Sequence, residues 1–208
     1  MNVPAHDSSA IWQFIRWNAG RIAIGVVLLM AAYAAINVAS TGQREHQIAK
    51  HIESLGGAVG FQTYLPDLIS DFAPETQLFD RIHSVSFSGN PVVMSEIIAE
   101  LRSLRDLESL ELNDSRITDF DLKYLKSLKT IKILDLSNTN LTDAGLENLR
   151  ELPQLETLSL LSTATTDSGL QHLKSLKRLK LLDLENTNVT EQGKAALKNF
   201  LPNCTIIP

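Results

Sequence analysis

The amino-acid sequence predicts an α/β solenoid that is preceded by a single N-terminal transmembrane helix. Residues 107–202 repeat with a period of 24, and the run 22–39 is apolar except for Gly25 and Asn37. Leucine is concentrated from Leu101 onward and is sparse between Ser40 and Glu100. A fixed period of this length is typical of a solenoid, because each unit buries its apolar face only by stacking on its neighbours.

Four successive rows of this length align without a gap, and the apolar spacing changes within each row. The first part of a row has leucines two positions apart, so both point to one face of a short strand. A coiled coil would need a 3.5-residue seam throughout, which these rows lack. We expect the following pairs to face the core: Leu110 and Leu112, Leu134 and Leu136, Leu158 and Leu160, and Leu182 and Leu184.

The second part of each row predicts a turn followed by a short helix. A hydroxyl residue in the turn can bond to the loop backbone, and the helix begins with a threonine N-cap and an acidic residue. The turn residues are Ser115, Thr139, Thr163 and Thr187; the caps are Thr118, Thr142, Thr166 and Thr190, followed by Asp119, Asp143, Asp167 and Glu191. Leucines at helical spacing, such as Leu122 and Leu125, are expected to return to the core.

These rows resemble leucine-rich repeats, in the variant with T-x-[IL]-T-D-x-G-L after the strand. The chain also resembles the short, membrane-anchored leucine-rich repeat proteins of planctomycete bacteria, in which an LGG segment and a terminal LPNC flank the repeats. Here these segments are residues 55–57 and 201–204, and the resemblance covers roughly residues 43–208. It implies parallel short strands on a concave face and helices on a convex face. Departures from the pattern occur at Asp121, Thr165, Glu191 and Lys194, and the ends resemble caps more than interior units.

The chain divides into a short tail (1–21), the transmembrane helix (22–39), a juxtamembrane region (40–104) and the repeats with a C-terminal cap (105–208). The juxtamembrane region predicts a helix over Gln43–Leu55, which ends at two glycines, and a strand over Ala58–Leu65. It also predicts a degenerate repeat, beginning with the alternating run Ile82–Phe87 and one residue longer than the others. We expect this repeat to cover the first edge of the sheet.

The apolar run 22–39 would measure about 27 Å as a helix, close to the roughly 30 Å hydrocarbon layer of a bilayer. Arg16 and Arg21 precede it and Arg44 follows it, which fixes its ends because arginine is costly inside a membrane. The small-x-small pattern at residues 32–34 leaves open a cleaved signal peptide, and a buried core helix is the third alternative. Because the closer arginine pair precedes the span, we expect the C-terminal domain on the non-cytoplasmic side of a bacterial inner membrane.

Composition argues against nucleic-acid binding and zinc modules, and the absence of catalytic motifs argues against an enzyme. The net charge is −5, and acidic and basic residues are balanced after Glu100, so no basic surface is predicted for a phosphate backbone. Cys204 is the one cysteine, so neither an internal disulfide nor a structural zinc site is expected. The sequence has no G-x-S-x-G elbow, phosphate-binding glycine loop or His-Glu-x-x-His motif, and we expect no catalytic residue, cofactor or metal.

The candidate site is the outward side of the strands, where residues of successive rows form columns about 4.8 Å apart. The predicted contact residues are Glu111, Asn113, Ile133, Asp135, Ser137, Ser159, Leu181, Asp183 and Glu185. Stacked acidic side chains are mildly destabilising, and together with exposed aliphatic residues they suit a basic, partly apolar peptide or protein. A solvated face without a ligand is the alternative, since the repulsion in water is about 1 kcal/mol or less and is screened by salt.

The sequence therefore predicts a membrane-tethered protein-binding module that uses the concave face of its repeat domain. The alternative function is a structural envelope protein that acts by lateral self-association and has no dedicated ligand. The oligomeric state is left open.

Overall fold

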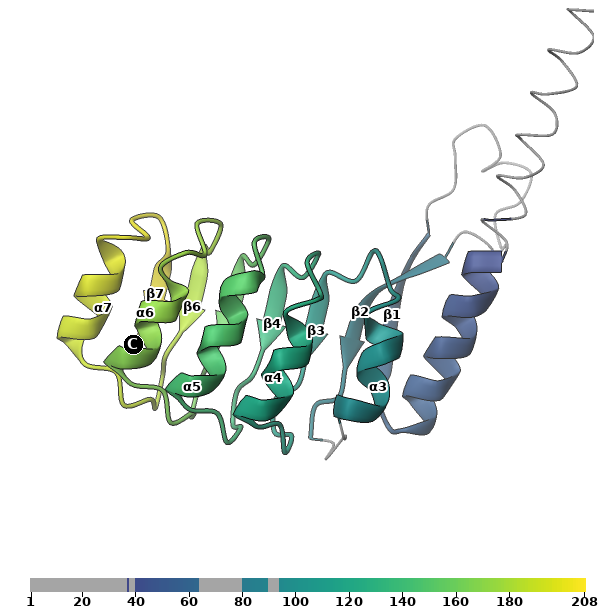
Figure 1. The fold of residues 1–208 in the computed structure, drawn as a ribbon, viewed down its shortest axis with the longest axis horizontal. Helices are drawn as coiled ribbons and strands as arrows, with labels where there is room; N and C mark the ends of the chain where they lie inside the picture. The colour runs from purple at the N-terminus through teal and green to yellow at the C-terminus, as the bar shows by residue number, and fades with distance from the viewer. Residues whose placement is uncertain (1–36, 38–39, 64–79, 90–93) are drawn as a thin grey trace, which may run out of the picture.

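Seven strands form one sheet whose spatial order follows the chain from β1 to β7. The computed structural model describes residues 37, 40–63, 80–89 and 94–208 (Figure 1). The strands are β1 (Ala58–Thr63), β2 (Asp80–Ser86), β3 (Ser109–Glu111), β4 (Ile133–Asp135), β5 (Thr157–Ser159), β6 (Leu181–Asp183) and β7 (Thr205–Ile207). Strands β2 to β7 are parallel to their neighbours, while β1 pairs antiparallel with β2.

The predicted inward leucines form the core of the repeats. All eight, from Leu110 to Leu184, are at most 2% exposed. The strand register places the first leucine of each pair beside its equivalent in the next row, as with Leu134 and Leu158. Because a buried leucine side chain contributes about 1.5 to 3 kcal/mol, stacking of the rows is the main source of stability that the period implies.

Helices lie along one face of the sheet (Figure 1). They are α3 (Met94–Leu101), α4 (Asp119–Leu125), α5 (Asp143–Leu146) with the 3-10 helix η2 (Glu147–Glu151), α6 (Asp167–Leu173) and α7 (Glu191–Lys198). The four predicted threonine N-caps directly precede α4, α5, α6 and α7. The four turn hydroxyls donate to backbone carbonyls three residues earlier at 2.5 to 2.7 Å, as also predicted.

A ladder of side-chain hydrogen bonds joins each helix start to the next. The Asp119 carboxylate accepts the backbone N–H of Thr142 at 2.9 Å and its hydroxyl at 2.6 Å. The same two bonds recur in the following rows, from Thr166 to Asp143 and from Thr190 to Asp167. A Cβ atom at Gly145 would overlap Asp119 Oδ1, so the ladder requires glycine at this position of the repeat.

The departures in the first and last rows follow from this ladder. Helix α3 begins with Met94, so the aspartate that begins α4 has no counterpart at the first position of α3. Asp121 takes this role within its own helix, because its Oδ2 accepts the backbone N–H of Thr118 at 2.9 Å and its hydroxyl at 2.7 Å. In the last row, Glu191 has no following cap to bind in the described chain, and it pairs instead with Lys194 at 2.8 Å.

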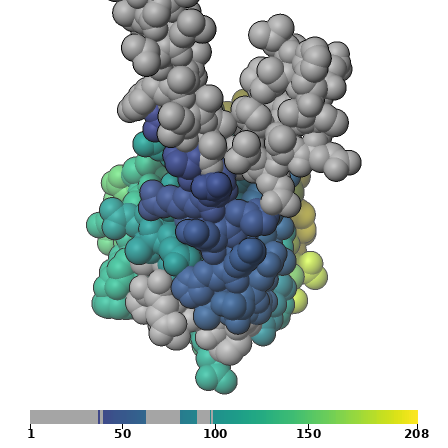
Figure 2. All heavy atoms as spheres, turned by 90° about the vertical axis from the view of Figure 1, so that its right-hand side faces the viewer, coloured from purple at the N-terminus to yellow at the C-terminus, as the bar shows by residue number. Residues whose placement is uncertain are grey.

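Residues 40–63 cover the N-terminal end of the sheet (Figures 1 and 2). The described helix 40–54 buries Ile52 completely, and the turn that follows it contains Gly56, which has a φ of 81°. A Cβ atom at Gly57 would lie 2.5 Å from the Phe87 ring, so the two glycines allow the chain to reverse closely against β2. The predicted helix and the beginning of the predicted strand are confirmed, although residues 64 and 65 lie outside the described part.

The degenerate repeat is present, but it does not form the edge of the sheet. Val85 pairs with Leu110, whereas Leu110 pairs with Leu134, so the first interval exceeds the repeat period by the one residue that was predicted. Its strand β2 covers the first edge of the four regular rows by pairing with β3, as predicted, and β1 then pairs antiparallel along the outer side of β2.

The C-terminal end closes with a strand that the leucine pattern does not predict. Strand β7 contains Thr-Ile-Ile in place of the usual leucine pair, yet it continues the parallel register of β6. Cys204 is fully buried in this cap, where it packs as a small apolar side chain, and burial raises the pKa of its thiol.

The predicted transmembrane helix and the tail before it lie outside the described residues, with the exception of Asn37. Among the residues that are described, no helix is both long enough and apolar enough to cross a membrane.

Candidate binding face

The outward residues of β3 to β6 form the predicted columns on the face opposite the helices, which we term the open sheet face. Register pairs Glu111 with Asp135, Asp135 with Ser159, and Ser159 with Asp183. The preceding column contains Ser109, Ile133, Thr157 and Leu181 in the same way. The structure therefore brings the predicted residues of these strands together.

The acidic column is internally hydrogen-bonded. Asp135 Oδ1 accepts the backbone N–H of Ser137 at 2.9 Å and its hydroxyl at 2.5 Å. The hydroxyls of Ser137 and Ser159 are 2.7 Å apart, and the Ser159 hydroxyl donates to Asp183 Oδ2 at 3.4 Å. These bonds use part of the hydrogen-bonding capacity of the Asp135 and Asp183 carboxylates, which the sequence predicts as contacts for a partner.

Ser137 is consequently not a contact residue, although the sequence predicts one there. Its side chain turns back onto Asp135, and the residue is only 5% exposed. Asp183 is half-buried and accepts the Glu185 backbone N–H at 3.0 Å. Asn113 is also half-buried and donates to the Ser88 hydroxyl at 2.8 Å.

The accessible part of the open sheet face combines apolar and acidic side chains. Ile133 is 45% exposed in the centre of the column, and Leu181 is half-buried two strands away. Glu111 and Glu185 are exposed. The two glutamates lie in the first and last rows, so the carboxylates available to a partner flank the aliphatic side chains.

A second charged column precedes the strands and was missed as a set by sequence reasoning. Lys132 Nζ lies 2.6 Å from Glu108 Oε1, and Lys180 Nζ lies 2.5 Å from Glu156 Oε2. The Lys180 hydrogen bond is the main cause that lowers the pKa of Glu156. The sequence feature that could have identified this column is the alternation of glutamate and lysine at the repeat period. The two lysines pair with these glutamates and not with the acidic column.

Two large aromatic side chains are exposed in the repeats and were not predicted. Phe120, at the start of α4, is 65% exposed, with Lys123 Nζ 2.9 Å from its ring centroid. Phe200, after α7, lies 4.0 Å from Lys174 Nζ. Both belong to helical segments and lie outside the open sheet face, so they offer positions for control variants.

No group of three or more histidine, cysteine, aspartate or glutamate side chains is arranged to hold a metal ion in the described part of the chain. On the open sheet face, Asp135, Ser137, Ser159 and Asp183 are hydrogen-bonded to one another, and Glu111 and Glu185 are exposed. This arrangement suits recognition by surface contact.

Comparison with known proteins identifies the repeat. Residues 105–164 match the family model described as leucine rich repeat. The chain thus contains leucine-rich repeats within an α/β fold of that type. No curated protein matches the sequence.

Solved structures with similar folds include three from different organisms. A leucine-rich repeat protein of Leptospira interrogans is 27% identical with a TM-score of 0.42, over 51% of this chain and 26% of that protein. Internalin C2 of Listeria monocytogenes is 26% identical with a TM-score of 0.49, over 67% of this chain and 60% of that protein. The ectodomain of the receptor kinase SOBIR1 from Arabidopsis thaliana is 16% identical with a TM-score of 0.48, over 79% and 91%. This chain therefore spans less than two thirds of the first two.

Proposed function

We propose that this chain is a membrane-tethered protein-binding module whose open sheet face, the predicted concave face, binds a basic and partly apolar segment of another protein. One observation carries the proposal: Ile133 is 45% exposed on strand β4, whereas the leucines on the opposite face of β3 to β6 are buried. An isolated exposed aliphatic residue is common, but here it lies beside Glu111 and Asp135 in adjoining columns.

The architecture supports this function. Stacked repeats generate an extended surface in which each strand adds one residue to every column, and repeat proteins commonly use such surfaces to bind proteins. Exposed acidic groups at the ends of an aliphatic patch favour a partner with basic residues on either side of an apolar one.

The tether is proposed from the apolar run 22–39 and its flanking arginines. With the amino terminus inside, the repeats would lie on the non-cytoplasmic side of a bacterial inner membrane. Alkaline washing of membranes tests this part, because a spanning helix keeps the intact chain in the vesicles and a peripheral chain is released.

A photo-crosslinking amino acid at position 133 of the full chain in membranes tests the binding face. We expect one heterologous product from this position and none from a crosslinker at position 120 on the helical side. The variant Glu111→Lys/Glu185→Lys should abolish the product, whereas the matched charge changes Glu147→Lys/Glu191→Lys on the helical side should preserve it. A homo-oligomeric ladder from position 133 would instead indicate the structural envelope function.

A further inference from the structure

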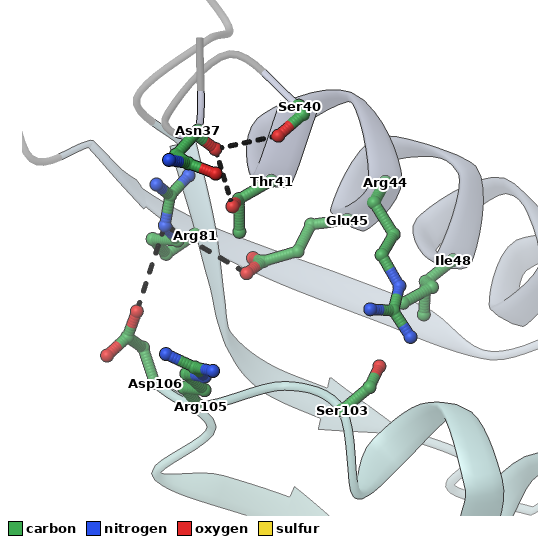
Figure 3. A pocket seen from close by; sticks show the side chains of 10 residues that line it. All are labelled: Asn37, Ser40, Thr41, Arg44, Glu45, Ile48, Arg81, Ser103, Arg105 and Asp106. Carbon is green, nitrogen blue, oxygen red and sulfur yellow. Dashed lines mark hydrogen bonds and ion pairs between the residues drawn. The ribbon is translucent and has the colours of Figure 1, made fainter. Parts of the chain in front are cut away.

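A polar cavity of about 700 Å³ lies at the N-terminal end of the described fold, between the start of helix 40–54, β2 and the loop after α3 (Figure 3). Three arginines and two carboxylates line it: Arg44, Arg81, Arg105, Glu45 and Asp106. These side chains come from three separate segments, so the cavity exists only because residues 40–63 fold onto the sheet. None of its lining residues belongs to the open sheet face.

The two carboxylates are engaged with one of the arginines. Arg81 Nε lies 3.9 Å from Glu45 Oε1 and 3.9 Å from Asp106 Oδ2. Glu45 also accepts the Ile82 backbone N–H at 2.7 Å and is almost fully buried. Arg81 is therefore positioned between the acids and does not present a free charge to a ligand.

Arg44 and Arg105 are available. Both are exposed, and neither side chain makes a hydrogen bond or ion pair with any described residue. With both carboxylates ionised, three arginines and two acids leave the cavity a net charge of one positive unit. Burial raises the pKa of Glu45, which makes the cavity more positive still when this group is protonated. The whole chain carries −5, so this local excess opposes the overall charge.

We propose that this cavity binds the phosphodiester of an anionic phospholipid headgroup, with Arg44 and Arg105 as the phosphate-binding side chains. Guanidinium groups bind phosphate oxygens through paired charge-assisted hydrogen bonds, and a single positive charge matches the single negative charge of a phosphodiester. The cavity begins at Asn37, at the end of the apolar run 22–39. The lipid source thus rests on the proposed membrane tether, which would hold the cavity near the headgroup layer.

Native mass spectrometry of the full chain released from nonionic detergent micelles tests the proposal, with phosphatidylglycerol, phosphatidylcholine and inorganic phosphate as probes. We expect phosphatidylglycerol to bind at least tenfold more tightly than phosphatidylcholine. The variant Arg44→Gln/Arg105→Gln should weaken this binding at least tenfold. The control Arg116→Gln/Arg150→Gln, which removes two exposed arginines elsewhere, should leave it unchanged.

If both double variants lost phosphatidylglycerol binding equally, or if neither lost it, the assignment of the cavity would be overturned. Inorganic phosphate that binds as tightly as phosphatidylglycerol would overturn the lipid source. Alkaline washing separates this proposal from the tether. We expect the Arg44→Gln/Arg105→Gln chain to stay in the washed vesicles although it no longer binds phosphatidylglycerol selectively. This result would show that the cavity acts as proposed and that the tether is independent of it. Release of the wild-type chain would overturn the tether instead.

Discussion

Glycine in the third position of each interior helix has a steric role that outweighs helix propensity. At an ordinary helix position, replacing glycine by alanine stabilises a protein by about 1 kcal/mol. At Gly169 the new Cβ would overlap Asp143 Oδ1 and lie 2.9 Å from Leu146 Cδ1. We therefore expect Gly169→Ala to lower the free energy of unfolding by about 1 to 3 kcal/mol, as measured by urea denaturation of the full chain in micelles.

The neighbouring exposed residue provides the control for this prediction. Ser168→Ala lies in the same helix and should be neutral or slightly stabilising, because alanine has the higher propensity. Adding Asp143→Ala to Gly169→Ala should cost less than the sum of the single changes, since the clash is with that carboxylate. A more stable Gly169→Ala protein would contradict the ladder.

Glu45 should make the protein less stable as the pH rises, whereas a carboxylate in a typical surface ion pair makes it more stable. Burial raises its folded-state pKa above the ordinary value of 4.5, in spite of the Ile82 backbone bond and nearby Arg81. The stabilising contribution of the protonated carboxyl is therefore complete below about pH 4.5 and is lost as pH rises through the raised pKa. Compared with Glu45→Gln, whose amide stays neutral, the wild type should lose relative stability between about pH 4 and pH 7.5.

Chemical denaturation of both proteins at the two pH values measures this difference. Subtracting the Glu45→Gln curve removes the titration of all other carboxylates, including Asp106. A wild type that gains relative stability with rising pH would show that the Arg81 ion pair dominates over burial.

At the scale of the element, we expect the protein to lose stability when the first repeat helix, α4, is changed to match the sequence of the later rows. Asp121 stands where the later rows have glycine, and its carboxylate accepts both hydrogen bonds from Thr118. Asp121→Gly restores the pattern but removes the cap and adds a flexible residue, so it should destabilise the protein by about 1 to 2 kcal/mol. Thermal unfolding measures the loss, and an unchanged midpoint would mean that Thr118 finds another partner.

The strand, turn and helix of each row could be predicted because their determinants lie within a single row. The Leu134 and Leu136 spacing identifies a buried strand face, and Thr142 identifies a helix start. The Asp119 to Thr142 bond could not be predicted in this way, since it joins adjacent rows and depends on how far each row rotates. The burial of Ser137 likewise depends on a side-chain rotamer that no sequence period specifies.

The two ends of the fold were harder to predict than the interior. Strand β1 departs from the parallel repeat, and its pairing with β2 is set by a chain reversal at Gly56 and Gly57 rather than by leucine spacing. Strand β7 lacks the leucine pair and follows from the register of β6 alone. Capping units have to end the array with a different surface, so they depart from the pattern that defines it.

At the scale of the whole molecule, each row should be stabilised only by the rows next to it. Each strand pairs with its sequence neighbours, and the ladder joins each helix start to the next one. A chain of nearest-neighbour interactions opens from its ends, whereas a globular core unfolds as one unit. The charged pairs Glu108 with Lys132 and Glu156 with Lys180 also connect adjacent rows.

This architecture predicts that a core truncation will act differently at the end and in the middle of the array. Leu158 and Leu201 are both buried, and truncation of either leucine to alanine should cost about 2 to 5 kcal/mol locally. Hydrogen exchange of the full chain should show that Leu201→Ala raises exchange in α7 and β7 while β3 and β4 keep their protection. Leu158→Ala should raise exchange in the rows on both sides of β5, because it removes the interface that each half stacks against. Uniform loss of protection in both variants would show that the rows unfold together, and the binding face would then depend on the caps as much as on its own strands.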